Sequence, residues 1–213
     1  MSLRLRLVLA SNNAGKLAEL QALFAPLPLD LVAQPSLGLA EAEEPYPTFI
    51  ENALAKARHA ALATGQAALA DDSGLCVDAL GGAPGVISAH YASVALLPGE
   101  REAQRRQQDA ANNALLLQRL QGVTERRAGF VCTLVALRSA DDPQPLVATG
   151  RWWGQVLEQP QGAGGFGYDP LLHIPALGAT VAELPRELKN AHSHRALACR
   201  QMLQLMQDAW SLA

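Results

Sequence analysis

The sequence predicts an α/β protein, because a strand, a polar turn, a helix and a second strand follow one another at its start. Residues 3–9 alternate between leucine and either arginine or valine, which is the period of a β-strand. The polar turn at residues 11–13 leads into apolar residues at helical spacing over 17–24. Pro26 ends that helix, and residues 29–33 then predict a second strand.

The middle of the chain predicts a helix, a strand, a polar connection and a second helix. Thr48 and Glu51 form a capping box, which predicts a helix that runs to about residue 64. A buried strand that ends at Asp71 and Asp72 is predicted next, because an apolar run over 67–70 leads into this pair. Residues 97–106 are polar and predict a mobile connection into another helix. The apolar residues of that helix are Leu115, Leu116 and Leu120.

The last third of the chain predicts two strands and a closing helix. Residues 130–137 predict a buried strand, and residues 146–157 predict a second one that pairs with it as a hairpin across 141–143. Residues 193–210 predict the helix, with Ala196, Leu197, Leu203 and Met206 on its apolar side. We find no repeat and no linker, so a single domain over residues 1–213 is expected.

Composition narrows the function classes. The apolar share of 49% supports a sizeable core, and the net charge of -3 disfavours a protein that coats nucleic acid. The three cysteines are odd in number and widely spaced, which fits neither a disulfide framework nor a zinc site. Charges interrupt the N-terminal apolar residues, so we expect neither a signal peptide nor a membrane span, and a cytoplasmic location.

Two adjacent aspartates, Asp71 and Asp72, lie between apolar runs and lead into Ser73 and Gly74. Carboxylates are costly to desolvate and neighbouring ones repel each other, so a fold usually keeps such a pair for a metal ion or for proton transfer. Oxygen ligands of this kind suit Mg²⁺ or Mn²⁺. The alternative is a strand-to-turn junction in which aspartate and glycine serve the turn. The pair alone does not decide between these interpretations.

Two other acidic or polar segments have both a functional and an ordinary interpretation. The turn Ser11-Asn12-Asn13-Ala14-Gly15-Lys16 offers backbone amides at a helix start, which favours an anion site, or it simply caps the helix. It lacks the spacing of a Walker A loop. Glu43 and Glu44 could meet the aspartates at one cation, or they belong to a solvated acidic loop.

The segment 162–167 satisfies the pattern G-x-G-x-x-G, but we reject a dinucleotide fingerprint. Asp169-Pro170 follows closely, and the residue before a proline is biased away from helix. A glycine loop that presents Phe166 and Tyr168 better suits a flat ligand such as a nucleobase, unless its aromatics only anchor it to the core.

Cations gather before and at the start of the last helix. Lys189, His194 and Arg195 could meet phosphates or a base edge, or they form a solvated helix start. Lys56, on the alanine-rich helix, is ambiguous from the sequence alone.

In this order, the segments resemble the inosine/xanthosine triphosphate pyrophosphatase family. Each motif is weak by itself, but the ordered set is specific and covers nearly the whole chain. The matching stretches are Ser11 to Lys16, Thr48 to Ala53, Ala70 to Leu75, Gly82 to Gly85, Gly164 to Pro170, and Ser193 to Arg195. The chain departs from some members at Asn12, where they have glycine, and it has an additional tryptophan in the pair Trp152-Trp153.

The resemblance implies a fold and an activity. The fold is an elongated mixed β-sheet flanked by helices, with two lobes and an active-site cleft between them. The activity is Mg²⁺-dependent hydrolysis of ITP, dITP and XTP to the monophosphate and pyrophosphate, which cleans the nucleotide pool; Mn²⁺ is an alternative metal. The resemblance also implies a homodimer, whereas the composition and the charged N-terminus lead us to expect no nucleic-acid or membrane partner.

The resemblance further implies site residues by position. Asp72 matches the catalytic general base, and Glu44 and Asp72 match the metal ligands. Residues that match substrate contacts are Ser11, Asn12, Asn13, Ala14, Gly15, Lys16, Lys56, Ser73, Phe166, Gly167, Tyr168, Asp169, Lys189, His194 and Arg195.

Two other functions stay open on the sequence. One is a nucleoside triphosphate pyrophosphatase with a different base preference, such as modified pyrimidines. The other is a non-catalytic nucleotide-binding module, in which the acidic residues only stabilise loops. Metal-dependent turnover of a panel of triphosphates separates all three.

Overall fold

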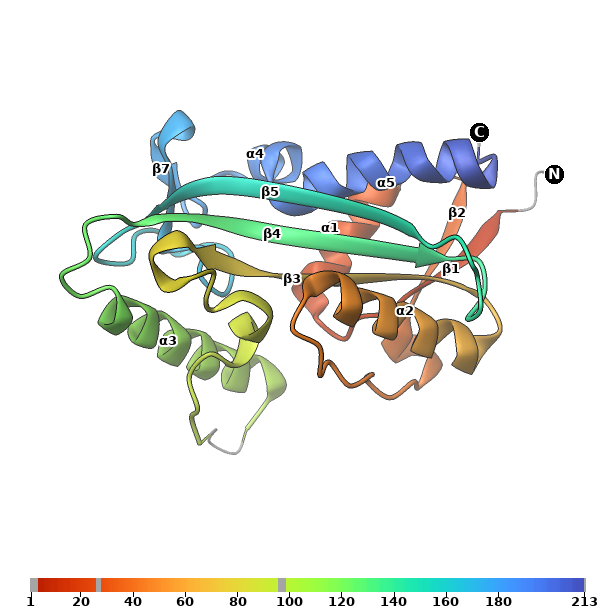
Figure 1. The fold of residues 1–213 in the computed structure, drawn as a ribbon, viewed down its shortest axis with the longest axis horizontal. Coiled ribbons are helices and arrows are strands. Elements are labelled where there is room, and N and C mark those ends of the chain that lie inside the picture. The colour runs from red at the N-terminus through yellow and green to blue at the C-terminus, as the bar shows by residue number, and fades with distance from the viewer. Residues whose placement is uncertain (1–3, 26–27, 96–98, 213) are drawn as a thin grey trace. The chain divides into compact units, whose positions relative to one another are not determined.

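The computed structural model describes residues 4–25, 28–95 and 99–212, and these contain a seven-stranded sheet (Figure 1). The strand order is β2-β1-β3-β4-β5-β6-β7. The strands are β1 (Leu5–Leu9), β2 (Leu29–Ala33), β3 (Ala67–Val77), β4 (Arg127–Leu137), β5 (Leu146–Val156), β6 (Leu172–Ile174) and β7 (Ala179–Thr180). β1 is parallel to β2 and β3, whereas β6 is antiparallel to β5 and β7. The predicted α/β class and mixed sheet are therefore confirmed.

Helices and short 3₁₀ turns connect the strands. The helices are α1 (Ala14–Phe24), α2 (Phe49–Thr64), α3 (Arg101–Arg119), α4 (Arg186–His192) and α5 (His194–Trp210). The 3₁₀ turns are η1 (Gln34–Leu37), η2 (Asp78–Leu80), η3 (Gly85–His90) and η4 (Pro175–Leu177). None of the helices in the described ranges has the length and apolar character needed to cross a membrane. Leu3 and Pro26, on which two sequence expectations rest, lie outside the described residues.

Side-chain caps fix the starts of three helices. The Asn13 side chain accepts a hydrogen bond from the Lys16 amide at 3.1 Å, so the polar turn does cap α1. Thr48 accepts from the Glu51 amide at 3.3 Å, and its hydroxyl donates to Glu51 Oε2 at 2.6 Å, so the predicted Thr48–Glu51 pair does cap α2. Ser193 in the same way caps α5.

Helix α3 begins earlier than the sequence indicates. The polar segment 97–106 was expected to be a connection, but the structure is helical from Arg101, and residues 97 and 98 lie outside the described part. The first two turns consist mainly of arginine, glutamate, alanine and glutamine, which favour a helix without any apolar period. In α5, Leu197 is also exposed rather than on the apolar side, whereas Ala196 and Met206 are fully buried.

The chain divides into two compact units, and each has its own core. Unit 1 comprises Met1–Asp72, Cys132–Arg151 and His192–Ala213, and unit 2 comprises Ser73–Val131 and Trp152–Ala191. The expected single domain, elongated shape and cleft between two lobes stay predictions.

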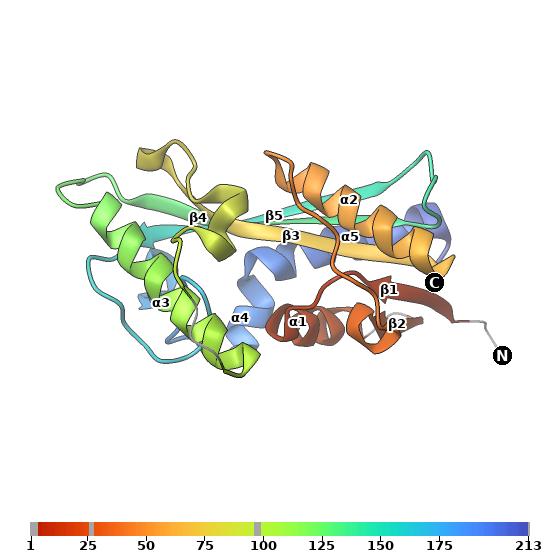
Figure 2. The ribbon, with the colours of Figure 1, turned by 90° about the horizontal axis from the view of Figure 1, so that it is seen from below.

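In unit 1, helices cover both faces of the sheet (Figures 1 and 2). Helices α1 and α5 pack on one face, where Leu7 and Leu69 meet Phe24 and Met202. The alanine-rich helix α2 packs on the other face, against residues such as Ala68. Because side chains alternate along a strand, odd-numbered residues of this half of β3 face α1 and α5, and even-numbered ones face α2.

Unit 2 has a second core, to which α3 contributes Leu116 and the residue after its end contributes Leu120. The loop 161–169 forms bends and turns and opens no helix, as expected from Asp169-Pro170. The short elements β6, β7 and α4 of this unit were not predicted from the sequence.

Candidate active site

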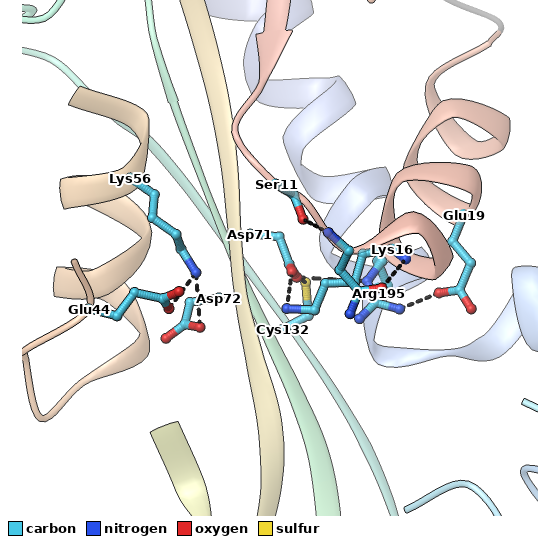
Figure 3. A network of polar contacts seen from close by, with 10 residues as sticks. Ser11, Lys16, Glu19, Glu44, Lys56, Asp71, Asp72, Cys132 and Arg195 are labelled. Carbon is cyan, nitrogen blue, oxygen red and sulfur yellow. Dashed lines mark hydrogen bonds and ion pairs between the residues drawn. The ribbon is translucent and has the colours of Figure 1, made fainter. Parts of the chain in front are cut away.

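Asp71 and Asp72 lie on opposite faces of β3 (Figure 3). Both are buried, with 2% and 4% of their surface exposed. The alternation of a strand separates them, so each carboxylate has its own set of neighbours. The adjacent pair therefore forms two sites with different chemistry.

Asp72 lies on the α2 side with Lys56 and Glu44. The Lys56 ammonium donates to Glu44 Oε2 at 2.7 Å and to Asp72 Oδ1 at 3.2 Å. Lys56 comes from the second turn of α2, and Glu44 comes from the loop before that helix. The structure thus brings together three residues that the sequence singled out, with one cation between two carboxylates.

The two carboxylate oxygens of Asp72 differ in their hydrogen bonding. Asp72 Oδ2 is buried and accepts no hydrogen bond from any residue that the structure describes. Burial raises the pKa of Asp72 to about 6, because the nearby Lys56 and Lys16 only partly offset the desolvation, and Glu44 and Asp71 add repulsion. For Lys56, burial opposes the charge, but Asp72 and Glu44 raise its pKa above the ordinary value. Asp72 therefore has one carboxylate oxygen that no described residue uses as an acceptor, and its pKa is close to neutral pH.

Asp71 lies on the opposite face, between two cations. Asp71 Oδ1 is 2.5 Å from the Lys16 ammonium, and Asp71 Oδ2 is 3.7 Å from Arg195 Nε. The thiol of Cys132, on β4, donates to Asp71 Oδ2 at 3.2 Å. Arg195 also pairs with Glu19 of α1, and it is only 2% exposed although it was a candidate for a solvated helix start.

This second group is electrostatically balanced. Burial alone would raise the pKa of Asp71, but Lys16, Arg195 and Lys56 together hold that pKa well below its usual range. Burial likewise opposes the charge of Arg195, yet Asp71 and Glu19 hold the pKa of the guanidinium above its ordinary value. Asp71 is therefore ionised at neutral pH, and its oxygens already have partners in the protein.

The turn Ser11 to Lys16 places backbone amides at the start of α1. The Ser11 hydroxyl accepts from the Asn13 amide at 3.2 Å, and Asn12 Oδ1 is 3.5 Å from the Gln34 amide nitrogen. Ala14 and Gly15 form the first helical turn. Because this turn ends in Lys16, it combines a helix N-terminus with a charge that is held by Asp71.

Gly150 in β5 allows the start of α5, which carries His194 and Arg195, to pack close to the sheet in unit 1. A Cβ atom at Gly150 of β5 would lie 1.9 Å from the His194 carbonyl oxygen and 2.6 Å from the Ala198 amide nitrogen. Only glycine allows α5 to approach the sheet this closely. His194 is 5% exposed, so both residues of the predicted pair are buried.

In unit 2, Asp169 organises the loop that carries Phe166. Asp169 Oδ2 accepts from the Phe166 amide and from the Lys189 ammonium, each at 2.9 Å. The same ammonium lies 4.7 Å from the centre of the Phe166 ring, which is a cation–π distance. A Cβ atom at Gly165 would lie 2.0 Å from Asp169 Oδ2, so the loop can close on this carboxylate only with glycine there.

The predicted residues thus form three groups, each internal to one unit. Glu44, Lys56 and Asp72 meet in unit 1, as do Lys16, Asp71 and Arg195; Phe166, Asp169 and Lys189 meet in unit 2. Ser73 directly follows Asp72 in β3, and Gly167 and Tyr168 lie within the Phe166 loop.

Sequence reasoning missed several partners of these residues. Glu19 lies three positions after Lys16 and therefore on the same side of α1. This spacing can be read from the sequence and could have indicated that Glu19 lies near the site. Cys132 lies in the apolar segment 130–137, and nothing local in the sequence indicates its contact with Asp71.

The donor set near Asp72 fits a hard divalent cation. Within the described ranges, no cluster of three or more histidine, cysteine, aspartate or glutamate side chains is placed to hold a metal ion. Mg²⁺ does not need such a cluster, because it commonly binds one or two carboxylates and completes its shell with water and phosphate oxygens. Asp72 Oδ2, which has no hydrogen-bond partner among the described residues, and the half-exposed Glu44 carboxylate are suited to that role.

Relatives of this chain carry consistent names. A protein of Methylibium petroleiphilum named dITP/XTP pyrophosphatase is 70% identical over 206 residues, which is 97% of this chain and 99% of the relative. A protein of Leptothrix cholodnii with the same name is 68% identical over 212 residues, or 98% of this chain and 100% of the relative.

Solved structures agree with the described fold. The structure of a HAM1 protein from Coxiella burnetii has a TM-score of 0.85 at 40% identity, covering 96% of this chain and all of that one. A nucleoside-triphosphatase / dITP/XTP pyrophosphatase from Mycobacterium abscessus has a TM-score of 0.70 at 37% identity, covering 94% of this chain and 97% of that one. The family model for Ham1 matches residues 7–205. By sequence and by fold, this chain belongs to the Ham1 family.

Proposed function

We propose that this protein hydrolyses deaminated purine nucleoside triphosphates, namely ITP, dITP and XTP, to the monophosphate and pyrophosphate. The observation that carries the proposal is the buried Asp72, which has one oxygen unpartnered among the described residues, a raised pKa and Lys56 beside it. The names of relatives that match almost the full chain support the substrate class. The same features support a nucleotide-pool hydrolase over a non-catalytic binding module.

The family is metal-dependent, and we propose Mg²⁺ as the metal, with Mn²⁺ as a substitute. Glu44 and Asp72 are the residues that would hold it, since each offers a hard carboxylate oxygen. A bound divalent cation would neutralise phosphate oxygens and stabilise the leaving pyrophosphate.

Asp72 is the proposed general base. A water oxygen attacks the α-phosphorus, the bond from this phosphorus to the bridging oxygen breaks, and pyrophosphate leaves. The water proton passes to the Asp72 carboxylate, whose pKa of about 6 is close to the pH at which such a base is most effective. Ser73, the next residue, is a proposed substrate contact.

Lys16, Lys56 and the amides of Ser11 to Gly15 are the proposed phosphate-binding groups. Backbone N–H groups at the start of α1 and two ammonium groups supply positive charge where the leaving group gains negative charge. Asp71 holds the Lys16 ammonium in position, which lowers the cost of ordering that long side chain when phosphate binds.

For the base, we propose that Phe166 stacks and that Gly167, Tyr168, Asp169, Lys189, His194 and Arg195 complete the recognition site. Hypoxanthine presents an N–H donor and a carbonyl acceptor where adenine presents the reverse, so fixed hydrogen-bonding groups would leave buried atoms unpaired with adenine. Because Asp169 is already bound to Lys189 and the Phe166 amide, its first role is to fix the loop.

Three further properties belong to the proposal. We propose a homodimer, a cytoplasmic location and no nucleic-acid or membrane partner; the net charge of -3 supports the absence of nucleic-acid binding. Light scattering coupled to size exclusion tests the dimer directly, and a monomer mass would contradict it.

The decisive experiment is steady-state hydrolysis of ITP, dITP, XTP, GTP, ATP and a modified pyrimidine triphosphate, with Mg²⁺ or with EDTA. Pyrophosphate and the nucleoside monophosphate are both quantified. We expect metal-dependent release of the two products from ITP, dITP and XTP only. Preference for the pyrimidine would establish the alternative pyrophosphatase, and binding without turnover would establish a non-catalytic module.

A further inference from the structure

Helix α3 reaches the loop that carries Phe166 through two polar side chains. We propose that Asp109 and Asn113 are positioning residues for base recognition, because they hold the backbone N–H and the backbone carbonyl of Gly167, the residue next to Phe166. This inference rests on the proposed function, in which Phe166 stacks on the base. It adds two residues that touch the loop and not the substrate.

The contacts are specific. Asp109 Oδ2 accepts from the Gly167 N–H at 2.8 Å, and the Asn113 side-chain amide donates to the Gly167 carbonyl oxygen at 3.0 Å. Asp109 and Asn113 are four positions apart in α3 and so lie on one face of the helix. Gly167 has φ +62°, a left-handed conformation that glycine adopts readily. One helix therefore fixes both ends of one residue in an unusual backbone conformation.

The neighbours of Gly167 are held as well. The Phe166 N–H donates to Asp169 Oδ2, and the Tyr168 hydroxyl donates to the Ser88 carbonyl oxygen at 2.9 Å. That carbonyl also accepts from the side-chain amide of Asn112, again in α3, at 3.2 Å. Three consecutive loop residues are thus restrained, and two of them are connected to the same helix.

The position of α3 is in turn set by the core of unit 2. Leu116 lies in a later turn of α3 and Leu120 directly follows the helix, and they are 0% and 1% exposed. The polar half of the helix contacts the loop while the apolar half is buried. Side chains on a fixed helix can preorganise Phe166, so that less order is lost when a base binds.

Isosteric substitutions test this arrangement without removing volume. Asp109→Asn keeps an oxygen that can accept from the Gly167 N–H, whereas Asn113→Asp replaces the donor with a second acceptor. Asp109→Ala removes the contact altogether. Gln118→Ala is the matched control, because Gln118 is an exposed residue of the same helix.

The test is to measure, for each variant, KM and kcat for ITP, the inhibition constant of inorganic tripolyphosphate, and Tm. Asp109→Ala and Asn113→Asp should raise KM for ITP about tenfold, with kcat and the tripolyphosphate constant nearly unchanged. Asp109→Asn should restore a KM close to wild type, and Gln118→Ala should match wild type throughout. Such a split between nucleoside and phosphate binding is not expected from general destabilisation.

Two results would overturn the inference. One is an unchanged KM for ITP in Asp109→Ala and Asn113→Asp. The other is a parallel loss of ITP and tripolyphosphate binding that accompanies a lower Tm and is not rescued in Asp109→Asn. Absence of ITP turnover in the wild-type protein is a separate result, because it contradicts the proposed function itself.

Discussion

Asp71 and Asp72 are chemically identical neighbours, but the two faces of β3 give them different environments. On the α1 and α5 face, Asp71 is held by Lys16 and Arg195, and its pKa is far below the usual range. On the α2 face, Asp72 shares one lysine with Glu44, and its pKa is raised to about 6. The difference shows that burial alone does not determine the pKa of a carboxylate, because the neighbouring cations and carboxylates shift it as well.

The largest expected effect is on the α2 face. Asp72→Asn removes the proposed base and should lower kcat for ITP by about 10²–10⁴-fold. Because Asp72 loses an unfavourable buried charge in this variant, the free energy of unfolding at pH 8 should not fall. Steady-state kinetics and urea unfolding measure the two effects. A folded variant with wild-type turnover would remove Asp72 from the mechanism.

The next largest effect is on the opposite face. Asp71→Asn leaves Lys16 and Arg195 without their shared counter-charge, so the free energy of unfolding should fall by about 3 kcal/mol. Urea unfolding of Asp71→Asn beside Asp72→Asn makes the comparison direct. If both variants lost equal stability, the two faces would not differ as described.

A third test uses pH, in EDTA so that no metal competes with the proton. Since the pKa of Asp72 is raised from 3.8 to about 6 on folding, its contribution to stability is present below pH 3.8 and is lost as pH rises to about 6. Asp72→Asn does not titrate. Wild type loses stability between pH 3.8 and about 6, whereas Asp72→Asn does not. The free energy of unfolding of Asp72→Asn minus that of wild type should therefore increase over this pH range, by about 1.4 kcal/mol per pH unit.

For Asp71, the sign is opposite. Its lowered pKa contributes stability above pH 3.8 that is lost as pH falls below that value. The difference in free energy of unfolding between Asp71→Asn and wild type should therefore shrink in acid.

For Asp72, the contradicting result is a difference in free energy of unfolding between Asp72→Asn and wild type that stays flat from pH 4 to 7. It would show that the pKa of Asp72 is not raised.

The smallest effect concerns Glu44. Its side chain is 45% exposed, so loss of its ion pair with Lys56 in Glu44→Gln should change stability by less than about 1 kcal/mol. The Mg²⁺ concentration for half-maximal ITP hydrolysis should nevertheless rise by about tenfold. Glu43→Gln, the adjacent exposed acid, is the control, and an equal shift in both variants would show that Glu44 is not a ligand.

The sequence predicted most of the fold because its main elements have clear periods and caps. The strands around Asp72 and the capped helices α1 and α2 were found in this way. The short elements β6 and β7 have three and two residues, too few to show any period. The start of α3 was missed because helix-forming polar residues without apolar spacing resemble a loop.

The site was predictable in its residue types and not in its pairings. Alternation in a strand already implies that Asp71 and Asp72 face opposite sides, but the sequence does not say which helix covers each side. Arg195 and Glu19 are 176 positions apart, and an arginine at a helix start is usually solvated. The sequence likewise does not indicate the contact of Asp109 with Gly167, because the two residues are 58 positions apart.

The contact between Cys132 and Asp71 also gives unit 1 a reporter of its own opening. Burial and the adjacent carboxylate raise the pKa of the Cys132 thiol well above its ordinary value, and burial likewise raises that of Cys199. Thiolates are the reactive form, so alkylating reagents should modify these cysteines only when the sheet and α5 transiently separate. Labelling rates would then time local opening around the site in the unmodified protein, without any introduced probe.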